Sequence, residues 1–428
     1  MGTRASQPAI GELLHLWWLA DPQSPRWVGT LRLKRRGAGQ PPGVSLEYAE
    51  AWLADGLALS EDLPLQRGEF LPTEADAAAG AVDDARPDRW GERVIRLLDR
   101  PPRLSTLDFL YFAGDERFGA LGVSLSASEY LPRRHGPTPQ LADLAAMHEL
   151  VHKLEAGEPV AEPLRRLVMP GTSLGGARPK ALITIDGDQR LVKFAEAGDL
   201  IDTPLVEHAT MTLAAQAGIQ ASMSWAIPLG PAGTGHAMAI RRFDRGPGAG
   251  EARRRRHALS AHVALRAAGQ EYGYPELALL LRRRAHADDI QKLGAELFRR
   301  MLFNILIDNT DDHEKNHVLL VDERQHYRLS PIFDVLPAGQ ALGYQQMRVG
   351  RNGADATLEN AISEHRAFGL TEERARANAA SVAEVVAGWK DHFAAAGVTP
   401  RDIDELTLQI DRDFLADQRR EAQAGGNR

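Results

Sequence analysis

Residues 303–320 hold the densest group of side chains with catalytic chemistry in the sequence. The segment reads FNILIDNTDDHEKNHVLL, so a polar stretch rich in Asp, Asn and His stands between two apolar runs. Ionisable side chains are rarely placed between buried segments unless they are paired or functional. We therefore take this segment as the candidate functional site.

The spacing of Asp311 and Asn316 is typical of phosphoryl transfer. In the catalytic loop of protein kinases an Asp accepts the proton of the substrate hydroxyl, and an Asn five residues later holds magnesium. The same enzymes need a second acidic metal ligand further along the chain. Asp334 meets this requirement, because it follows an expected hairpin and an apolar run, where a buried carboxylate is costly unless it binds a cation.

A zinc protease site is a second interpretation of the same segment. His313, Glu314 and His317 match H-E-x-x-H, in which two His side chains one helical turn apart bind zinc and the Glu is the general base. The motif requires a continuous helix. Turn-forming residues at 309–312 and a strand-like segment at 318–329 leave room for about two helical turns at most. The zinc hydrolase is therefore the less favoured alternative, and a polar turn without chemistry is the third.

The composition is that of an ordinary globular protein. Of the 428 residues 43% are hydrophobic and 25% are charged, and no apolar run reaches the length of a membrane span. Cysteine is absent, which excludes disulfides, thiolate metal sites and cysteine nucleophiles and indicates a reducing compartment. We expect a cytoplasmic protein without membrane association. The net charge of -7 argues against electrostatic binding of nucleic acid by the whole chain.

Further elements around the site fit the requirements of a kinase. Lys193 stands inside an apolar strand, and Glu207 lies in the first turns of the helix that follows; kinases pair a strand lysine with a helix glutamate in this way. Before that strand, the double glycine Gly175-Gly176 allows backbone amides to approach an anion, and Arg178 and Lys180 supply positive charge.

The periodicity of apolar residues predicts a mixed chain. Strands and short helices are expected up to residue 140, and a helix over 141–154. A hairpin turning at Asp186 and Gly187, a helix over 204–216 and a strand over 237–245 follow. Beyond a Gly/Pro/Arg linker the chain is mostly helical, with helices expected over 291–307 and 371–395 and from residue 399 onward.

Five segments together resemble the HipA family of toxin-antitoxin serine/threonine kinases. They are residues 173–180, Lys193, residues 240–245, residues 309–316 and residues 329–334. Residues 15–120, with Asp-Arg-Trp-Gly at 88–91 and Arg-Phe-Gly-Ala-Leu at 117–121, resemble the amino-terminal region of the same family. The resemblance thus covers nearly the whole chain.

The resemblance implies an α+β, two-lobed, protein-kinase-like fold, with an α/β amino-terminal part and a mostly helical carboxy-terminal lobe. Residues 1–140 would form the HipA-type amino-terminal α+β region. Residues 141–250 would form the kinase amino-terminal lobe with the nucleotide loop, the strand lysine and the hinge. Residues 251–428 would form the helical lobe with the catalytic loop and the metal-binding Asp.

The resemblance also assigns roles to single residues. Asp311 would be the catalytic base, Asn316 and Asp334 the magnesium ligands, and Lys193 the catalytic lysine that contacts phosphate, supported by Glu207. The implied ATP-binding residues are Gly175, Gly176, Ala177, Arg178, Pro179, Lys180, Lys193, Arg241, Arg242, Phe243, Asp312 and His313. Ser173 matches the serine that such kinases autophosphorylate, a modification that ejects the nucleotide loop and inactivates the enzyme.

The partners are likewise implied by the family. Its members phosphorylate proteins of translation, notably glutamyl-tRNA synthetase, and are neutralised by a small helix-turn-helix antitoxin, HipB-like, encoded beside them. We expect ATP and Mg²⁺ as cofactors, a protein substrate such as an aminoacyl-tRNA synthetase, and DNA contact mainly through the antitoxin. A catalytically silent corepressor is a further alternative, and the intact set of Lys193, Asp311, Asn316 and Asp334 argues against it.

Overall fold

The computed structural model describes residues 10–35, 41–171, 176–230, 235–246, 253–337 and 340–426. The chain divides into two compact units. The first comprises the described residues within 1–137, 169–173 and 245–257, and the second those within 138–168, 174–244 and 258–428. The division into residues 1–140, 141–250 and 251–428 stays a prediction.

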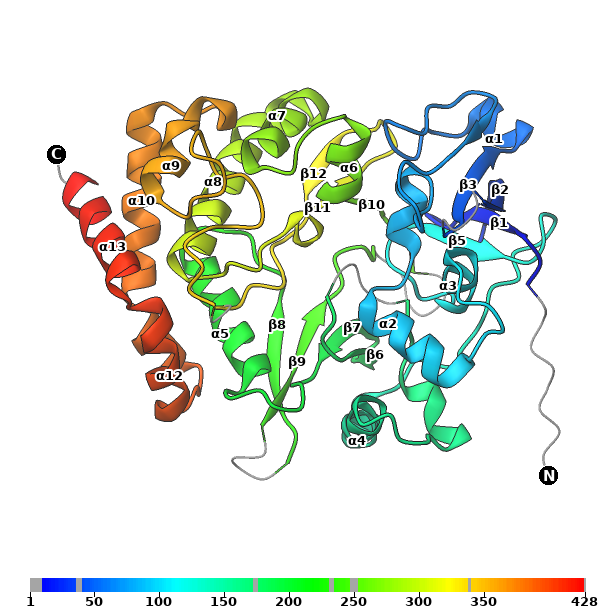
Figure 1. Ribbon diagram of the computed structural model, residues 1–428, viewed down its shortest axis with the longest axis horizontal. Coiled ribbons are helices and arrows are strands. Elements are labelled where there is room, and N and C mark those ends of the chain that lie inside the picture. Colours follow the sequence, from blue (N-terminus) through cyan, green and yellow to red (C-terminus); the bar gives the residue numbers. More distant parts are fainter. Residues whose placement is uncertain are drawn as a thin grey trace. The chain divides into compact units, whose positions relative to one another are not determined.

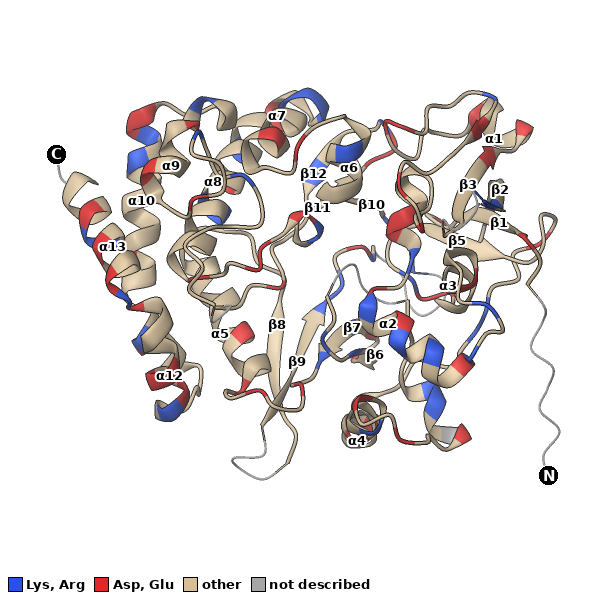
Figure 2. Cartoon of the chain, in the orientation of Figure 1, with Lys and Arg blue, Asp and Glu red and all other residues tan. Residues whose placement is uncertain are grey.

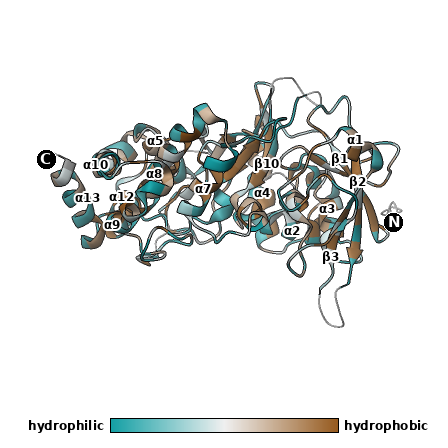
Figure 3. Ribbon diagram, turned by 90° about the horizontal axis from the view of Figure 1, so that it is seen from above, coloured by the Kyte–Doolittle hydropathy of each residue, from teal (hydrophilic) through white to brown (hydrophobic). Residues whose placement is uncertain are grey.

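The first unit is built on an antiparallel five-stranded sheet with the order β4-β3-β2-β1-β5. Its strands are β1 (Leu13–Trp18), β2 (Arg26–Lys34), β3 (Gly43–Tyr48), β4 (Glu69–Phe70) and β5 (Leu121–Ser124). Leu14 and Leu16 of β1 and Val28 and Leu31 of β2 are fully buried, whereas polar residues such as Arg26 of β2 and Glu47 of β3 are exposed. Figure 3 colours the hydrophobic residues of these strands brown. This pattern is typical of strands that pack one face on a core.

Short helices complete the first unit. They are α1 (Glu50–Asp55), the 3₁₀ turn η1 (Gly80–Ala85), α2 (Arg89–Val94), the π turn η2 (Ile95–Asp99) and α3 (Thr106–Phe112). The Asp88 carboxylate accepts a hydrogen bond from the Gly91 amide at 2.8 Å and so caps α2.

The second unit contains a four-stranded antiparallel sheet with the order β6-β7-β9-β8. Its strands are β6 (Lys180–Ile185), β7 (Asp188–Lys193), β8 (Ser224–Pro228) and β9 (His236–Arg241). The predicted hairpin is present, and both turn residues, Asp186 and Gly187, have positive φ. A two-residue hairpin needs this conformation, and Asp-Gly is a preferred pair for it.

One long helix packs against this sheet. Helix α5 (Thr203–Gln216) has Asp202 as its N-cap and Pro204 in its first turn. It contacts β8 and β9 and also α10 and α11 of the helical part (Figure 1). Its buried residues are not confined to one side of the helix, as expected of a helix covered on opposite faces. Helix α4 (Leu144–Glu155) lies between the 3₁₀ turns η3 (Leu141–Asp143) and η4 (Glu162–Leu167).

The rest of the second unit is mostly helical, with a small sheet of order β10-β11-β12. The strands are β10 (His257–Ser260), β11 (Val318–Val321) and β12 (Tyr327–Leu329). The helices and helical turns are α6 (Ala261–Ala267), α7 (Tyr274–Arg284), η6 (Ala287–Asp289), α8 (Ile290–Leu306), η7 (Glu314–Asn316), α9 (Leu358–Ser363), η8 (His365–Phe368), α10 (Glu372–Ala387), α11 (Trp389–Ala395), α12 (Pro400–Ile410) and α13 (Asp413–Gly426). Acidic and basic residues follow α12 and α13 along their length (Figure 2). Among the described helices, none combines the length and apolarity needed to cross a bilayer.

Two helix boundaries differ from the sequence prediction. The helix expected over 371–395 breaks at Gly388, which separates α10 from α11. The helix expected from residue 399 ends at Ile410, and Phe414 belongs to the separate helix α13. Apolar periodicity continues across both breaks, so periodicity alone does not reveal them.

Gly294 in α8 provides a stability test of the helical packing. A Cβ atom at Gly294 would lie 2.2 Å from the Phe368 carbonyl oxygen. Gly294→Ala should therefore lower the free energy of unfolding by about 1–3 kcal/mol, the usual cost of overpacking, although alanine has the higher helix propensity. Urea unfolding measures this change.

Gly425 in α13 is the matched control, because no atom lies within 4 Å of the position that a Cβ atom would take there. Gly425→Ala should leave the free energy of unfolding unchanged or slightly raised. Equal effects of the two substitutions would contradict the tight contact of α8 with Phe368.

Candidate active site

The centre of the candidate site is an ion-pair cluster around Lys193. The Lys193 ammonium donates to Glu207 Oε1 at 2.6 Å and to Asp334 Oδ1 at 2.5 Å. Lys193 ends β7 and Glu207 lies in the first turns of α5, so sheet and helix meet at this bond. Lys180 pairs directly with Lys193 across the hairpin, which places both lysine side chains on one face of the sheet.

These charges strongly affect one another. Burial alone would raise the pKa of Asp334, but the positive charges of Lys193 and Lys180 outweigh burial and lower that pKa to about 2. Burial alone would lower the pKa of Lys193, and the two carboxylates raise it above its usual value instead. Burial keeps the pKa of Glu207 raised. Because the pKa of Asp334 is depressed, its pairing stabilises the fold at neutral pH, and this contribution is lost as the pH falls toward 2.

Asp334 is held in an unusual backbone conformation. Its φ of 58° lies in the left-handed region, which costs energy for a residue with a side chain and often marks functional sites. The preceding Ile332 is fixed by hydrogen bonds with Gln220 and Ser222, of 2.7 and 3.0 Å, and Phe333 packs against Phe243 with 5.4 Å between the ring centroids.

The described part of the predicted nucleotide loop borders this cluster. Gly176 has a φ of 91°, and a Cβ atom there would lie 2.7 Å from Lys180 Nζ and 3.9 Å from Asp334 Oδ2. The positive φ favours glycine at this position, and the Lys180 ammonium lies so close that it would have to move to make room for a side chain. Arg178 is anchored by a 2.7 Å ion pair with Asp199. Ala177 is exposed and Pro179 is buried, whereas Ser173 and Gly175 lie outside the described residues.

The catalytic-loop candidates follow the end of α8. The loop runs from Asp308 to the 3₁₀ turn η7, and the Asn316 side chain donates to the Asp311 carbonyl at 3.4 Å. The Oδ1 atom of Asn316 is buried and accepts no hydrogen bond. His313 Nδ1 is likewise buried without a partner. Asp308 Oδ2 and Thr310 Oγ1 in the same loop are also buried without a partner, and a group of such atoms indicates a place for a ligand or an ordered water.

Asp311 has the electrostatic character of a base. Partial burial raises the pKa of its carboxyl group, and the negative charges of Asp334 and Asp312 add to this, although His313 and Arg178 oppose it. The charges of Asp334 and Arg178 are thus close enough to act on Asp311. Asp311 therefore lies within electrostatic range of Asp334, one member of the ion-pair cluster.

Asp312 lies behind the loop rather than in an open site. Its Oδ2 atom accepts hydrogen bonds from Tyr274, from Asn304 at 2.8 Å and from His317 Nε2 at 2.9 Å. Burial alone would raise the pKa of Asp312, but His317 and the hydrogen bonds lower it. The role of Asp312 in ATP binding stays a prediction. Its carboxylate connects the candidate catalytic loop to α7 and α8.

We expect Asp312→Asn to lower the free energy of unfolding by about 3 kcal/mol or more, because it leaves buried donors without their charged acceptor. The pKa of Asp312 is depressed, so the destabilisation should be full at neutral pH and should shrink as the pH falls below the ordinary range of an Asp. Urea unfolding at several pH values measures both effects. Asp311→Asn, at the exposed neighbour, is the control, and equal stability of the two variants would contradict the buried network.

The H-E-x-x-H interpretation is not favoured by the geometry. His313 and His317 both have extended backbones, and only the three residues of η7 between them are helical. His317 Nε2 is engaged with Asp312, and the Glu314 carboxylate bonds His262 of α6 at 2.9 Å. Within the described ranges, no three His, Asp or Glu side chains are grouped so that they could hold a metal ion.

The predicted hinge residues differ in their surroundings. Arg242 forms a buried, two-pronged ion pair with Asp244, with distances of 3.0 and 2.7 Å. Arg241 is exposed, and Phe243 packs on Phe333 beside Asp334. Their contact with ATP stays a prediction.

Several residues that support the site were not singled out from the sequence. They are Asp199, His262, Tyr274 and Asn304, which hold Arg178, Glu314 and Asp312. Each is a single polar residue without a motif around it, so only its tertiary contact reveals its role.

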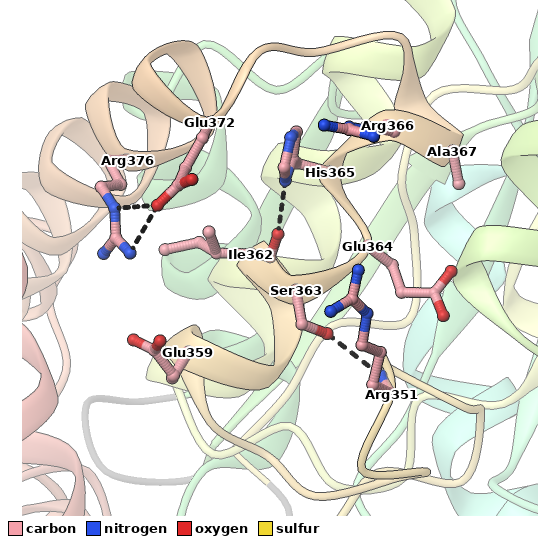
Figure 4. Close-up of a pocket in the computed structure, with 10 residues that line it drawn as sticks. All are labelled: Arg351, Glu359, Ile362, Ser363, Glu364, His365, Arg366, Ala367, Glu372 and Arg376. Carbon is pink, nitrogen blue, oxygen red and sulfur yellow. Dashed lines mark hydrogen bonds and ion pairs between the residues drawn. The ribbon is translucent and has the colours of Figure 1, made fainter.

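A separate cavity of about 490 Å³ contains none of the predicted site residues. It lies among α9, η8 and α10 and is lined by charges of both signs (Figure 4). Glu372 and Arg376 pair across one wall at 2.8 Å, and the Arg351 amide donates to Ser363 at 3.0 Å.

Comparisons with known proteins identify the family. Residues 172–389, slightly more than half of the chain, match the HipA-like C-terminal domain, and residues 24–124 match the HipA N-terminal domain. The chain is similar in structure to HipA from the complex of HipA, HipB and operator DNA of Shewanella oneidensis MR-1. That likeness has a TM-score of 0.63 and 18% sequence identity and covers 96% of each chain.

The chain is less similar in structure to the proinflammatory kinase CtkA of Helicobacter pylori. It has a TM-score of 0.41 and 11% identity and covers 60% of this chain and 94% of CtkA. The fold predicted from the sequence is confirmed by the HipA likeness. The two domain matches together show that this chain belongs to the HipA family.

Proposed function

We propose that the chain is a HipA-like toxin kinase that transfers the γ-phosphoryl group of ATP to a serine or threonine of a protein. The observation that carries the proposal is the pair of hydrogen-bonded ion pairs that Lys193 makes with Glu207 and Asp334. Gly176 and Lys180 border this cluster. Protein kinases use a strand lysine paired with a helix glutamate, and a metal-binding Asp, for phosphoryl transfer.

The residues present fit a magnesium ion. Asn316 Oδ1 is a buried acceptor without a hydrogen bond, and Asp334 is ionised at any physiological pH because its pKa is about 2. Magnesium prefers such oxygen ligands and usually binds one or two protein groups together with substrate phosphates. When bound, it would neutralise charge on the phosphate oxygens.

The remaining residues of the site act on substrate and protons. Asp311, with its raised pKa, accepts the hydroxyl proton of the substrate serine or threonine. Lys193 and Lys180 place two positive charges on the same face of the sheet, where they attract the phosphates. Gly176 leaves room for a close approach, and Glu207 keeps the Lys193 ammonium in position.

We further propose that the enzyme phosphorylates its own Ser173 and that a HipB-like, DNA-binding antitoxin neutralises it, so that DNA is contacted mainly through the antitoxin. Family membership supports this regulation, and HipA of Shewanella oneidensis forms a complex with HipB and operator DNA. A translation protein such as an aminoacyl-tRNA synthetase is the proposed substrate, on the same family grounds.

Intact-mass analysis of the purified protein with Mg²⁺ and ATP tests the proposal. Wild type and Lys315→Ala, an exposed neighbour in the loop, should gain one phosphate, whereas Asp311→Ala and Ser173→Ala should gain none. No mass gain in wild type, with stoichiometric zinc in the sample, would favour the zinc hydrolase. No mass gain and no zinc, together with binding of the antitoxin, would favour the silent corepressor.

A further inference from the structure

We propose that the three C-terminal helices α11, α12 and α13 position the two halves of the catalytic site, with His392 and Arg412 as the positioning residues. We call these helices the C-terminal brace. The brace follows the region that matches the HipA-like C-terminal domain, which ends at residue 389. The inference rests on the proposed function, because it concerns the helix that carries Glu207 and the loop that carries Asp311.

His392 of α11 forms hydrogen bonds with three residues of α5. Its Nε2 atom lies 2.9 Å from Thr212 Oγ1 and 3.1 Å from the Ala209 carbonyl oxygen, and its Nδ1 atom lies 3.0 Å from Gln216 Nε2. Because a carbonyl oxygen only accepts, Nε2 must carry the proton, and Nδ1 then accepts from the Gln216 amide. One neutral imidazole thus ties together two turns of α5.

His392 contacts the side of α5 opposite to Glu207. At 100° per residue, Ala209, Thr212 and Gln216 lie about 140° to 200° around the helix from Glu207. Glu207 bonds Lys193 on one side of α5 while His392 bonds the other side. Since the Lys193–Glu207 bond is 2.6 Å long, a displacement of α5 by about 1 Å would break it.

A second contact holds the start of α5. The Asp202 side chain caps the helix by accepting from the Leu205 amide at 3.4 Å, and it also pairs with His236 at 2.6 Å. The amide of Asp202 donates to the Asp402 carboxylate of α12 at 3.4 Å. The brace therefore reaches both ends of the helix.

Arg412, between α12 and α13, holds the catalytic loop. Its guanidinium donates to Asp308 Oδ1 at 2.6 Å, and Asp308 is 1% exposed with a left-handed φ of 60°. This strained residue is where the chain leaves α8 and enters the loop. Arg419 of α13 adds a weaker hydrogen bond of 3.5 Å to the Leu306 carbonyl, at the end of α8.

The location of these contacts indicates positioning rather than general stabilisation. The brace has its own apolar anchors, Trp389, Phe393, Leu406, Ile410 and Leu415, all buried. His392 and Arg412 are instead polar residues. His392 bonds α5, whose Glu207 holds Lys193, and Arg412 bonds the loop that carries Asp311. Hydrogen bonds and ion pairs fix direction as well as contact, which apolar packing alone does not.

Hydrogen–deuterium exchange of the nucleotide-free protein tests the brace. In His392→Ala, amides of residues 203–216 should exchange about tenfold faster, a factor of the size expected for the loss of its partly buried hydrogen bonds to α5. In Arg412→Ala, the same change should appear in residues 308–317. Asp391→Ala and Arg420→Ala, exposed neighbours on α11 and α13, are the matched controls and should leave both segments unchanged.

Unchanged exchange in residues 203–216 of a folded His392→Ala protein would overturn the proposal. An equal rise throughout the second unit would also overturn it, because it would show a general loss of stability. Autophosphorylation rates add a coupling test: His392→Ala should slow wild type about tenfold but should have no further effect in Glu207→Gln. If wild type transfers no phosphate, the proposed function fails, whereas the exchange result still decides on the brace.

Discussion

Asp311→Asn should reduce phosphoryl transfer by about 10²–10⁴-fold, the usual contribution of a general base. The Asn side chain has nearly the same shape but cannot accept the hydroxyl proton. The nucleotide affinity should change little, because Asp311 makes no bond to the Lys193 cluster. Single-turnover phosphorylation and a nucleotide-binding titration measure the two quantities separately.

The pH dependence of wild type gives an independent check on Asp311. Partial burial and the neighbouring carboxylates raise its pKa, and a base acts only when it is deprotonated. The transfer rate should therefore begin to fall, on lowering the pH, above the range of an ordinary Asp. A normal rate for Asp311→Asn, or an acid limb that persists in that variant with unchanged position, would remove Asp311 from the role of base.

Asp334→Asn should reduce the rate of phosphoryl transfer by a similar factor, because it removes a proposed magnesium ligand. Loss of a metal ligand removes several kcal/mol of transition-state stabilisation, which corresponds to a rate loss on the order of 10³-fold. The distinctive result should be the magnesium dependence: the nucleotide affinity of the variant should respond much less to magnesium than that of wild type. Titrations with and without magnesium measure this ratio.

Asp322→Asn is the control for Asp334→Asn, because Asp322 lies in the turn between β11 and β12 and caps that turn. It should keep the wild-type rate and magnesium dependence. If Asp334→Asn also keeps them, the metal must bind elsewhere. The remaining Lys193–Glu207 bond should hold the variant folded, and thermal unfolding verifies this.

The candidate site was predictable from the sequence because its residues lie in short motifs with fixed spacing. Asp311 and Asn316 share one loop, and Lys193 and Glu207 end a strand and begin the next helix, so local structure alone nearly defines their geometry. The HipA resemblance drawn from these motifs is confirmed by the family matches. The roles of the residues stay predictions.

The supporting contacts were not predictable, because they do not depend on short motifs with fixed spacing. Asp312 sits beside Asp311 in the sequence, yet its carboxylate is buried against Tyr274 and Asn304, which lie on α7 and α8. Arg242 finds its partner in Asp244, two residues on. Neither outcome follows from spacing, because each depends on which side of the loop or strand faces the core.

The way in which distant segments join the first compact unit was not visible in the sequence. The first unit also includes the described residues within 169–173 and 245–257, which lie far along the chain. The glycine and proline residues near both segments are visible in the sequence, but they indicate only a change of direction. Which unit a segment joins depends on long-range packing.

The C-terminal brace has a consequence for the order of synthesis. A ribosome adds about 5–20 residues per second from the amino end, and domains fold as they emerge. Lys193, Glu207, Asp311 and Asp334 are all translated before His392 and Arg412. A nascent chain therefore carries every candidate catalytic residue while α5 and the loop still lack their polar anchors, so that a kinase of the proposed kind would acquire its active geometry only after residue 412 has been synthesised.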